Sequence, residues 1–127
     1  MNLYHDLILD HYRNPRNFGT LANPDIVVKE TNASCGDEIE MFLTMSLRPA
    51  GIRLIHWRGQ GCAISMAGAS MLSDQVKNRK FKIRNILEIT DHDMIEMLGG
   101  EISSARIKCA TLALTALRKA IVAEGKE

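Results

Sequence analysis

The chain has 127 residues, of which 46% are hydrophobic and 24% are charged. This composition is typical of a folded globular protein and excludes a disordered, collagen-like or low-complexity chain. Lys and Arg total 16 against 15 acidic residues, and a formal net charge of +1 gives no overall field toward nucleic acid or a membrane surface. We expect a single domain spanning residues 1–127.

The N-terminus lacks the basic start and apolar run of a signal peptide, and no stretch approaches the roughly 18 apolar residues of a membrane span. We therefore expect a cytoplasmic protein with no membrane partner. The three cysteines, Cys35, Cys62 and Cys109, are odd in number and widely spaced. In a chain without export signals this pattern argues against a disulfide framework and leaves free thiols.

The first predicted element is a short amphipathic helix from Asn2 to Tyr12, which Asn14-Pro15 ends. The sequence Asn23-Pro24-Asp25 breaks the chain again, and the β-branched residues from Ile26 to Val28 begin a first strand.

A second strand is predicted from Ile39 to Leu47, where large apolar side chains occupy every other position. Arg48-Pro49-Ala50-Gly51 then predicts a hairpin turn, and Ile52 to Arg58 predicts the returning strand.

The second half of the chain is predicted to be helical. One helix starts immediately after Cys62 and includes residues 63–72. Residues 81–98 predict two short helices, the second capped by Thr90 and ended by Gly99-Gly100. A long helix covers residues 110–124, immediately after Cys109. Strands followed by helices indicate an α+β fold, a sandwich in which helices cover one face of an antiparallel sheet.

Two of the cysteines thus precede predicted helix N-termini, and the third, Cys35, precedes a strand. Unpaired helical N–H groups and the helix dipole favour thiolate over thiol, which makes a cysteine nucleophilic and ready to bind a soft metal. The alternative is that each cysteine is a small residue of the core.

Asp37 stands two residues after Cys35, so an extended backbone would point its carboxylate to the same side as that thiol. Three thiolates and one carboxylate suit a tetrahedral zinc ion or the iron atoms of a small cluster. The carboxylate is the weakest of the four ligands and would let the site release its metal. The spacing alone is a poor metal signature, because the chain has no Cys-x-x-Cys pair.

Other polar and soft side chains have simpler interpretations. The histidines are predicted to be structural or on the surface, and the methionines to fill the core. Five basic residues form a cluster that predicts a solvated face or, next, a surface for an acidic protein. No nucleic-acid partner is expected, because only 5% of residues are aromatic. The residues concerned are His5, His11, His56 and His92, Met41, Met45, Met66, Met71, Met94 and Met97, and Lys77, Arg79, Lys80, Lys82 and Arg84.

Four sequence blocks together resemble the IscU/SufU/NifU N-terminal family of iron–sulfur cluster assembly scaffolds over almost the whole chain. The blocks are His11-Tyr12-Arg13-Asn14-Pro15-Arg16-Asn17, Ser34-Cys35-Gly36-Asp37, Gly59-Gln60-Gly61-Cys62-Ala63-Ile64-Ser65-Met66-Ala67 and Arg106-Ile107-Lys108-Cys109-Ala110-Thr111-Leu112. The resemblance implies an α/β sandwich with a small three-stranded antiparallel sheet.

The resemblance also implies a site and partners. Cys35, Asp37, Cys62 and Cys109 match the positions that hold zinc or a nascent [2Fe–2S] cluster. A cysteine desulfurase would deliver persulfide sulfur, with Cys109 or Cys35 as first acceptor, and apo iron–sulfur proteins would receive the product. The protein would act as a monomer or as a cluster-bridged dimer, as a carrier more than an enzyme.

Two departures separate this chain from parts of that family. Lys108 stands where the IscU branch has histidine, as in the SufU branch, but the interval from Cys62 to Cys109 is too short for the full SufU insertion. A cluster scaffold and a zinc-dependent sulfurtransferase therefore both stay open, as does a purely structural zinc. The residues from Ser103 to Lys108 replace the segment that an Hsp70-type chaperone grips, which puts that partner in doubt.

Lys108 also has a physical interpretation of its own. A protonated amine beside Cys109 would stabilise its thiolate and could pair with Asp37 when no metal is bound, which would make the carboxylate a gated ligand. The alternative is a solvated lysine near a helix start.

Overall fold

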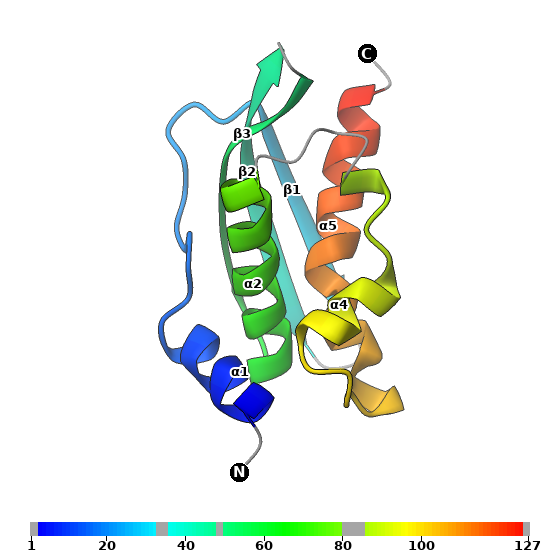
Figure 1. The fold of residues 1–127 in the computed structure, drawn as a ribbon. Helices are drawn as coiled ribbons and strands as arrows, with labels where there is room; N and C mark the ends of the chain where they lie inside the picture. The colour runs from blue at the N-terminus through cyan, green and yellow to red at the C-terminus, as the bar shows by residue number, and fades with distance from the viewer. Residues whose placement is uncertain (1–2, 33–35, 48–49, 80–85, 126–127) are drawn as a thin grey trace.

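The computed structural model describes residues 3–32, 36–47, 50–79 and 86–125. Figure 1 shows a small sheet with helices packed along it. In chain order the elements are α1 (Leu3–Arg13), β1 (Ile26–Asn32), β2 (Asp37–Leu47), β3 (Ala50–Gln60), α2 (Ala63–Arg79), α4 (Asp91–Met97), the 3₁₀ turn η1 (Ser104–Arg106) and α5 (Ile107–Gly125).

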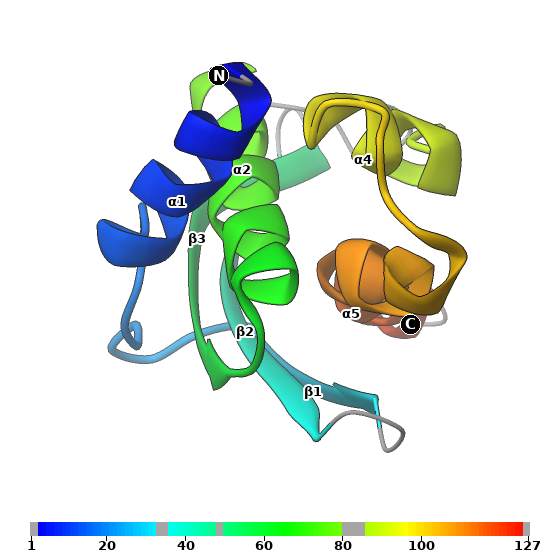
Figure 2. The same cartoon turned by 90° about the horizontal axis from the view of Figure 1, so that it is seen from below.

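The strands form one antiparallel sheet in the order β1-β2-β3, and the helices cover one of its faces. Figure 2 shows α2 and α5 side by side against the sheet, with α1 packed on the outer side of α2 and α4 near α5. This is the predicted α+β sandwich with a three-stranded antiparallel sheet. None of the described helices combines the length and the apolar character that crossing a bilayer requires.

The alternating pattern of β2 explains why the sheet carries helices on one face. Ile39, Met41 and Leu43 are fully buried against α2 and α5. On the opposite face Phe42 lies under the Arg58 guanidinium, 5.5 Å from the ring centroid. The main core brings these strand residues together with apolar residues of the helices, among them Trp57, Leu72, Val76, Met94, Leu114, Leu117 and Ile121.

The second helix of the 81–98 stretch is confirmed in its cap and its end. The Thr90 hydroxyl accepts a hydrogen bond from Asp93 N at 3.1 Å, and Thr90 N donates to the Asp93 carboxylate at 2.9 Å. Gly99 and Gly100 both have positive φ, at 107° and 80°, and the helix ends just before them, at Met97 with Leu98 as its C-cap. Residues 81–85 of the first expected helix lie outside the described residues.

Several predicted boundaries are wrong. β2 begins at Asp37 rather than Ile39 and β3 at Ala50 rather than Ile52, because Asn32 pairs with Asp37 and Leu47 with Ala50. Two positions of the predicted hairpin turn, 48 and 49, lie outside the described residues.

The last helix also starts earlier than predicted. α5 begins at Ile107 instead of Ala110, because η1 leads directly into it and no helix-breaking residue separates the two. Cys109 therefore lies inside the first turn of α5, not before the helix.

The segment that follows α1 is fixed onto α2 by a buried polar network. His11 Nδ1 lies 2.7 Å from the Ser70 hydroxyl oxygen, which also accepts a hydrogen bond from Arg16 N at 2.9 Å. The Asn17 amide donates to the Ser73 hydroxyl at 3.1 Å, and the Trp57 indole N–H donates to Arg16 O at 2.9 Å. The block from His11 to Asn17 thus has a structural role that anchors α1.

The strand register brings three chain segments to one end of the sheet. Asn32, the last residue of β1, pairs with Asp37, the first of β2, and Glu38 pairs with Gln60, the last of β3. The chain then enters α2, and the N-terminus of α5 lies at the same end, the lower one in Figure 1. Two helix N-termini and the start of a strand therefore meet at this end.

Candidate metal centre

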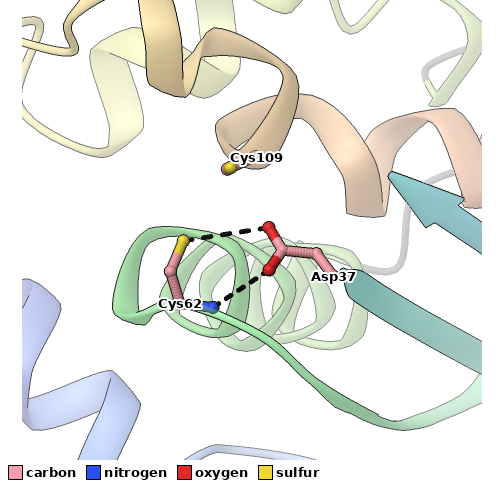
Figure 3. A group of neighbouring side chains, drawn as sticks. All are labelled: Asp37, Cys62 and Cys109. Carbon is pink, nitrogen blue, oxygen red and sulfur yellow. Dashed lines mark hydrogen bonds between the residues drawn. The ribbon is translucent and has the colours of Figure 1, made fainter. Parts of the chain in front are cut away.

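Asp37, Cys62 and Cys109 lie together at this end of the molecule. One ligand atom from each, a carboxylate oxygen or a sulfur, lies within 4.8 Å of the other two. Figure 3 shows the three side chains pointing toward one another from β2, from the residue before α2 and from α5. The prediction that distant thiols and one carboxylate gather into one place is confirmed for these three residues.

The Asp37 carboxylate lies over the start of α2. Its Oδ1 accepts a hydrogen bond from Cys62 N at 3.2 Å, and its Oδ2 lies 3.8 Å from Cys62 Sγ (Figure 3). Asp37 is only 2% exposed. A buried carboxylate is costly unless it is hydrogen-bonded, and the N–H groups and dipole at the N-terminus of α2 provide that stabilisation.

The Cys62 sulfur belongs to the same helix terminus. The Ser65 hydroxyl donates to Cys62 O at 3.0 Å and lies 3.6 Å from Cys62 Sγ. Burial raises the pKa of the Cys62 thiol, and so does the nearby Asp37 charge. Hydrogen bonds from the Ser65 N–H and hydroxyl and from Cys109 outweigh both, so the pKa lies below its ordinary value of 9.0. The direction of this shift agrees with the prediction that a helix start favours the thiolate form of Cys62.

Cys109 is 1% exposed and approaches the group from α5. The Asn32 amide nitrogen lies 4.0 Å from its sulfur, at the outer limit for a hydrogen bond to sulfur. Among the described residues, Cys62 and Cys109 are not joined in a disulfide.

Arg106 is the cation beside the two sulfurs, and the sequence interpretation did not give it that role. The charge of Cys62 and hydrogen bonds to the Cys62 and Cys109 sulfurs raise the pKa of the exposed Arg106 guanidinium above its ordinary value. The sequence feature that indicates this role is the position of Arg106 three residues before Cys109, because residues three apart share a helix face. Lys108 is exposed and lines a hollow between β1 and α5 with Glu30 and Thr111.

Cys35 lies outside the described residues. The prediction that its thiol lies on the same side as the Asp37 carboxylate assumes an extended backbone between the two residues. That assumption is wrong at Gly36, whose φ of +72° is left-handed and turns the chain before β2 begins.

The other candidates lie away from this group. His11 contacts Ser70, and His56 Nδ1 lies 3.1 Å from Thr20 O. His92 is exposed and lies 3.6 Å from Glu96. The methionines are confirmed as core residues: Met41, Met66, Met71 and Met94 are buried, and Met45 and Met97 pack against the core. In the basic cluster, Lys77 is exposed, the side chain of Arg79 is not among those described, and Lys80, Lys82 and Arg84 lie outside the described residues.

The donor set fits a soft or borderline divalent metal. Zinc bonds of about 2.3 Å to sulfur and about 2.0 Å to oxygen give tetrahedral edges of about 3.5 Å between oxygen and sulfur and about 3.8 Å between sulfurs. The 3.8 Å from Cys62 Sγ to Asp37 Oδ2 lies near that edge, and the 4.8 Å limit for the whole group leaves a contraction of about 1 Å. Two thiolates and one carboxylate would hold such an ion and leave room for a further ligand.

Two thiols and a carboxylate at one end of an α+β sandwich define the class: a small domain with a candidate metal centre built on two helix N-termini and a strand. The profile of the NifU-like N terminal domain matches residues 3–125. The chain belongs to the NifU-like N-terminal domain family.

Two relatives place the chain within that family, and one solved structure supports its fold. It is 39% identical over 137 residues to the zinc-dependent sulfurtransferase SufU of Bacillus subtilis (strain 168), covering 96% of this chain and 91% of that protein. It is 34% identical over 120 residues to the iron–sulfur cluster assembly scaffold protein IscU 1 of Archaeoglobus fulgidus, and the match covers 94% of this chain and 75% of that protein. A crystal structure of a nitrogen-fixing NifU-like protein (N-terminal) from Brucella abortus superposes with a TM-score of 0.80. The superposition covers 98% of this chain and 96% of that one. At 18% identity this last match supports the fold alone.

Proposed function

We propose that this protein is a scaffold that assembles a labile [2Fe–2S] cluster and passes it to apo iron–sulfur proteins in the cytoplasm. It acts as a single domain of residues 1–127, as a monomer or a cluster-bridged dimer, and receives its sulfur from a cysteine desulfurase. Iron and sulfide are its cargo. Asp37, Cys62 and Cys109 hold them, with Cys35 as the fourth ligand.

The observation that carries this proposal is the gathering of three ligand atoms within 4.8 Å. One of the three is a carboxylate, which binds iron and zinc less tightly than a thiolate does. A site with one weak ligand can release its contents, which a carrier needs and a permanent cofactor site does not.

Sulfur arrives by exchange between thiols. A thiolate of the scaffold attacks the outer sulfur of the desulfurase persulfide, a new sulfur–sulfur bond forms, and the desulfurase cysteine leaves as thiolate. An external reductant must then convert this sulfane sulfur to sulfide. Cys35 or Cys109 is the first acceptor in this proposal. Because Cys109 is buried, its use requires that docking of the desulfurase uncover it.

The second candidate function is that of a zinc-dependent sulfurtransferase. It is favoured by the 39% identity to the Bacillus subtilis protein with that name and by Lys108 in the Arg106-Ile107-Lys108-Cys109 sequence. In this case Asp37 and the cysteines hold Zn²⁺, which keeps the thiols deprotonated, and one thiolate accepts sulfur.

Anaerobic purification, reconstitution with iron and sulfide, visible spectroscopy and elemental analysis distinguish the two functions. The scaffold takes up iron and sulfide in equal amounts, shows sulfide-to-iron charge-transfer bands and transfers the cluster to an apo-ferredoxin. Tight stoichiometric zinc, no cluster uptake and a large stimulation of desulfurase turnover would overturn the scaffold proposal in favour of the sulfurtransferase.

Asp25 gives a matched control for the carboxylate. Its Oδ2 accepts a backbone hydrogen bond from Met45 N at 2.6 Å, as the Asp37 carboxylate does from Cys62 N, but at the opposite end of β2. Asp37→Ala is expected to change cluster or zinc retention, and Asp25→Ala to leave it unchanged.

A further inference from the structure

Gly61 lies directly beneath the Asp37 carboxylate. A Cβ atom built on Gly61 would lie 2.5 Å from Asp37 Oδ1, 2.8 Å from Asp37 Cγ and 2.6 Å from the Ser65 hydroxyl oxygen. Real Cβ atoms essentially never approach other heavy atoms this closely. The carboxylate therefore occupies the space that any other residue at position 61 would fill with its side chain.

The backbone at position 61 does not itself require glycine. Gly19, Gly36, Gly99 and Gly100 have positive φ, whereas Gly61 does not. A left-handed backbone is therefore not the reason for glycine at position 61. Glycine is needed at this position because the Asp37 carboxylate and the Ser65 hydroxyl both lie where a Cβ atom would stand.

Ser65 contacts Cys62, which is the proposed metal ligand next to Asp37. Its side chain is fully buried, and its hydroxyl donates to Cys62 O at 3.0 Å while lying 3.6 Å from Cys62 Sγ. The hydroxyl thus fixes the Cys62 backbone at the first turn of α2 and lies beside the sulfur of that residue. Gly61 and Ser65 together determine where the carboxylate and this thiol stand relative to one another.

We propose that Gly61 and Ser65 are positioning residues of the metal centre, Gly61 through Asp37 and Ser65 through Cys62. Neither residue offers an atom to the metal in this proposal. The inference rests on the proposed function only in that Asp37 and Cys62 bind a metal. Loss of residues that orient metal ligands typically weakens metal binding by about 10-fold to 100-fold.

Ser73 is the matched control for Ser65. It lies on the same helix, is also fully buried, and donates a hydrogen bond to the carbonyl oxygen three residues before it, Ser70 O, at 2.8 Å. Its other contacts are with Asn17 and Arg16, away from the metal centre. Ser73→Ala removes the same local hydrogen bond as Ser65→Ala without touching Cys62.

The test measures zinc affinity of the full chain by competition with a chromophoric chelator, together with the absorption spectrum of the Co²⁺ form. Gly61→Ala and Ser65→Ala are expected to weaken zinc binding about 10-fold to 100-fold and to shift the Co²⁺ bands, while Ser73→Ala stays within about threefold of the parent. Melting curves of the metal-free proteins show whether each variant folds.

A double-variant cycle separates action through Asp37 from general damage to the fold. If Gly61 acts through Asp37, Gly61→Ala weakens zinc binding more in the parent chain than in an Asp37→Ala background, where the added Cβ meets only the Ser65 hydroxyl. An equal loss in both backgrounds, or parent affinity and an unshifted Co²⁺ spectrum in Gly61→Ala, overturns the role of Gly61. Should Gly61→Ala not fold, parent affinity in Ser65→Ala overturns the proposal.

These outcomes differ from failure of the proposed function. If the parent chain bound zinc no more tightly than Asp37→Ala, the metal centre itself would be wrong. If the parent bound zinc tightly, Asp37→Ala lost it and both positioning variants kept it, only the inference about Gly61 and Ser65 would fall.

Discussion

Removing the metal from this protein is expected to lower its melting temperature by about 10 °C. The ligands come from β2, from the start of α2 and from α5, and Asp37 and Cys62 alone are 25 residues apart in the chain. An unfolded chain does not present such a site, so metal binding energy adds to the free energy of unfolding.

The size of the shift follows from mass action. With free zinc about 100-fold above its dissociation constant, binding to the folded state alone adds about 2.7 kcal/mol. An unfolding entropy of about 2.1 cal/mol/K per residue gives about 270 cal/mol/K for a chain of 127 residues. Dividing the free energy added by binding by this unfolding entropy gives a shift of about 10 °C in the melting temperature.

Differential scanning calorimetry of the zinc-loaded protein and of the same preparation with excess chelator measures this shift. Asp37→Ala is expected to remove most of it, because the chain then lacks one ligand, and Asp25→Ala to retain it. Equal melting temperatures with and without chelator would refute the reasoning. So would a 10 °C shift that persists in a protein lacking Asp37, Cys62 and Cys109, because the metal would then bind elsewhere.

Three further predictions concern the core, the pH dependence and Lys108. Leu114→Ala, at a fully buried position, is expected to lower the free energy of unfolding in urea by about 2–5 kcal/mol, and a loss below about 1 kcal/mol would contradict the described core. Burial and the Arg16 charge hold the pKa of His11 below its ordinary value of 6.5, so the folded state favours the neutral ring. The contribution of His11 to the free energy of unfolding is complete above pH 6.5 and is lost as the pH falls through the lowered pKa. His11→Gln should remove this decline from urea titrations. Lys108→Met is expected to leave the rate–pH profile of Cys109 alkylation unchanged, because Lys108 lines the exposed hollow with Glu30 and Thr111, and a slower alkylation near neutral pH would show that Lys108 does act on that thiol.

Much of this fold could be predicted because its patterns are local. Alternation over β2 depends on which face of one strand is buried, and the cap at Thr90 depends on a residue only three positions away. The block from His11 to Asn17 was visible as a motif, but its role was not. Its partners, Ser70 and Ser73, are more than fifty residues away and have no pattern that links them to it.

The site could be predicted only in part for the same reason. Helix starts after Cys62 and near Cys109 were local signals, and they correctly indicated sulfurs at helix N-termini. The roles of Gly61 and Arg106 depend on which side chains the fold brings beside them, Asp37 in one case and Cys62 in the other. Sequence spacing cannot show such contacts.

The central claim is that sulfur and carboxylate ligands from three separate elements hold one metal ion. X-ray absorption at the zinc edge of the zinc-loaded protein tests it most directly. The account predicts a shell of sulfur scatterers at about 2.3 Å with at least one oxygen at about 2.0 Å, and a loss of sulfur from that shell in both Cys62→Ser and Cys109→Ser. A shell of only nitrogen and oxygen scatterers, or a sulfur count that neither substitution changes, would contradict it.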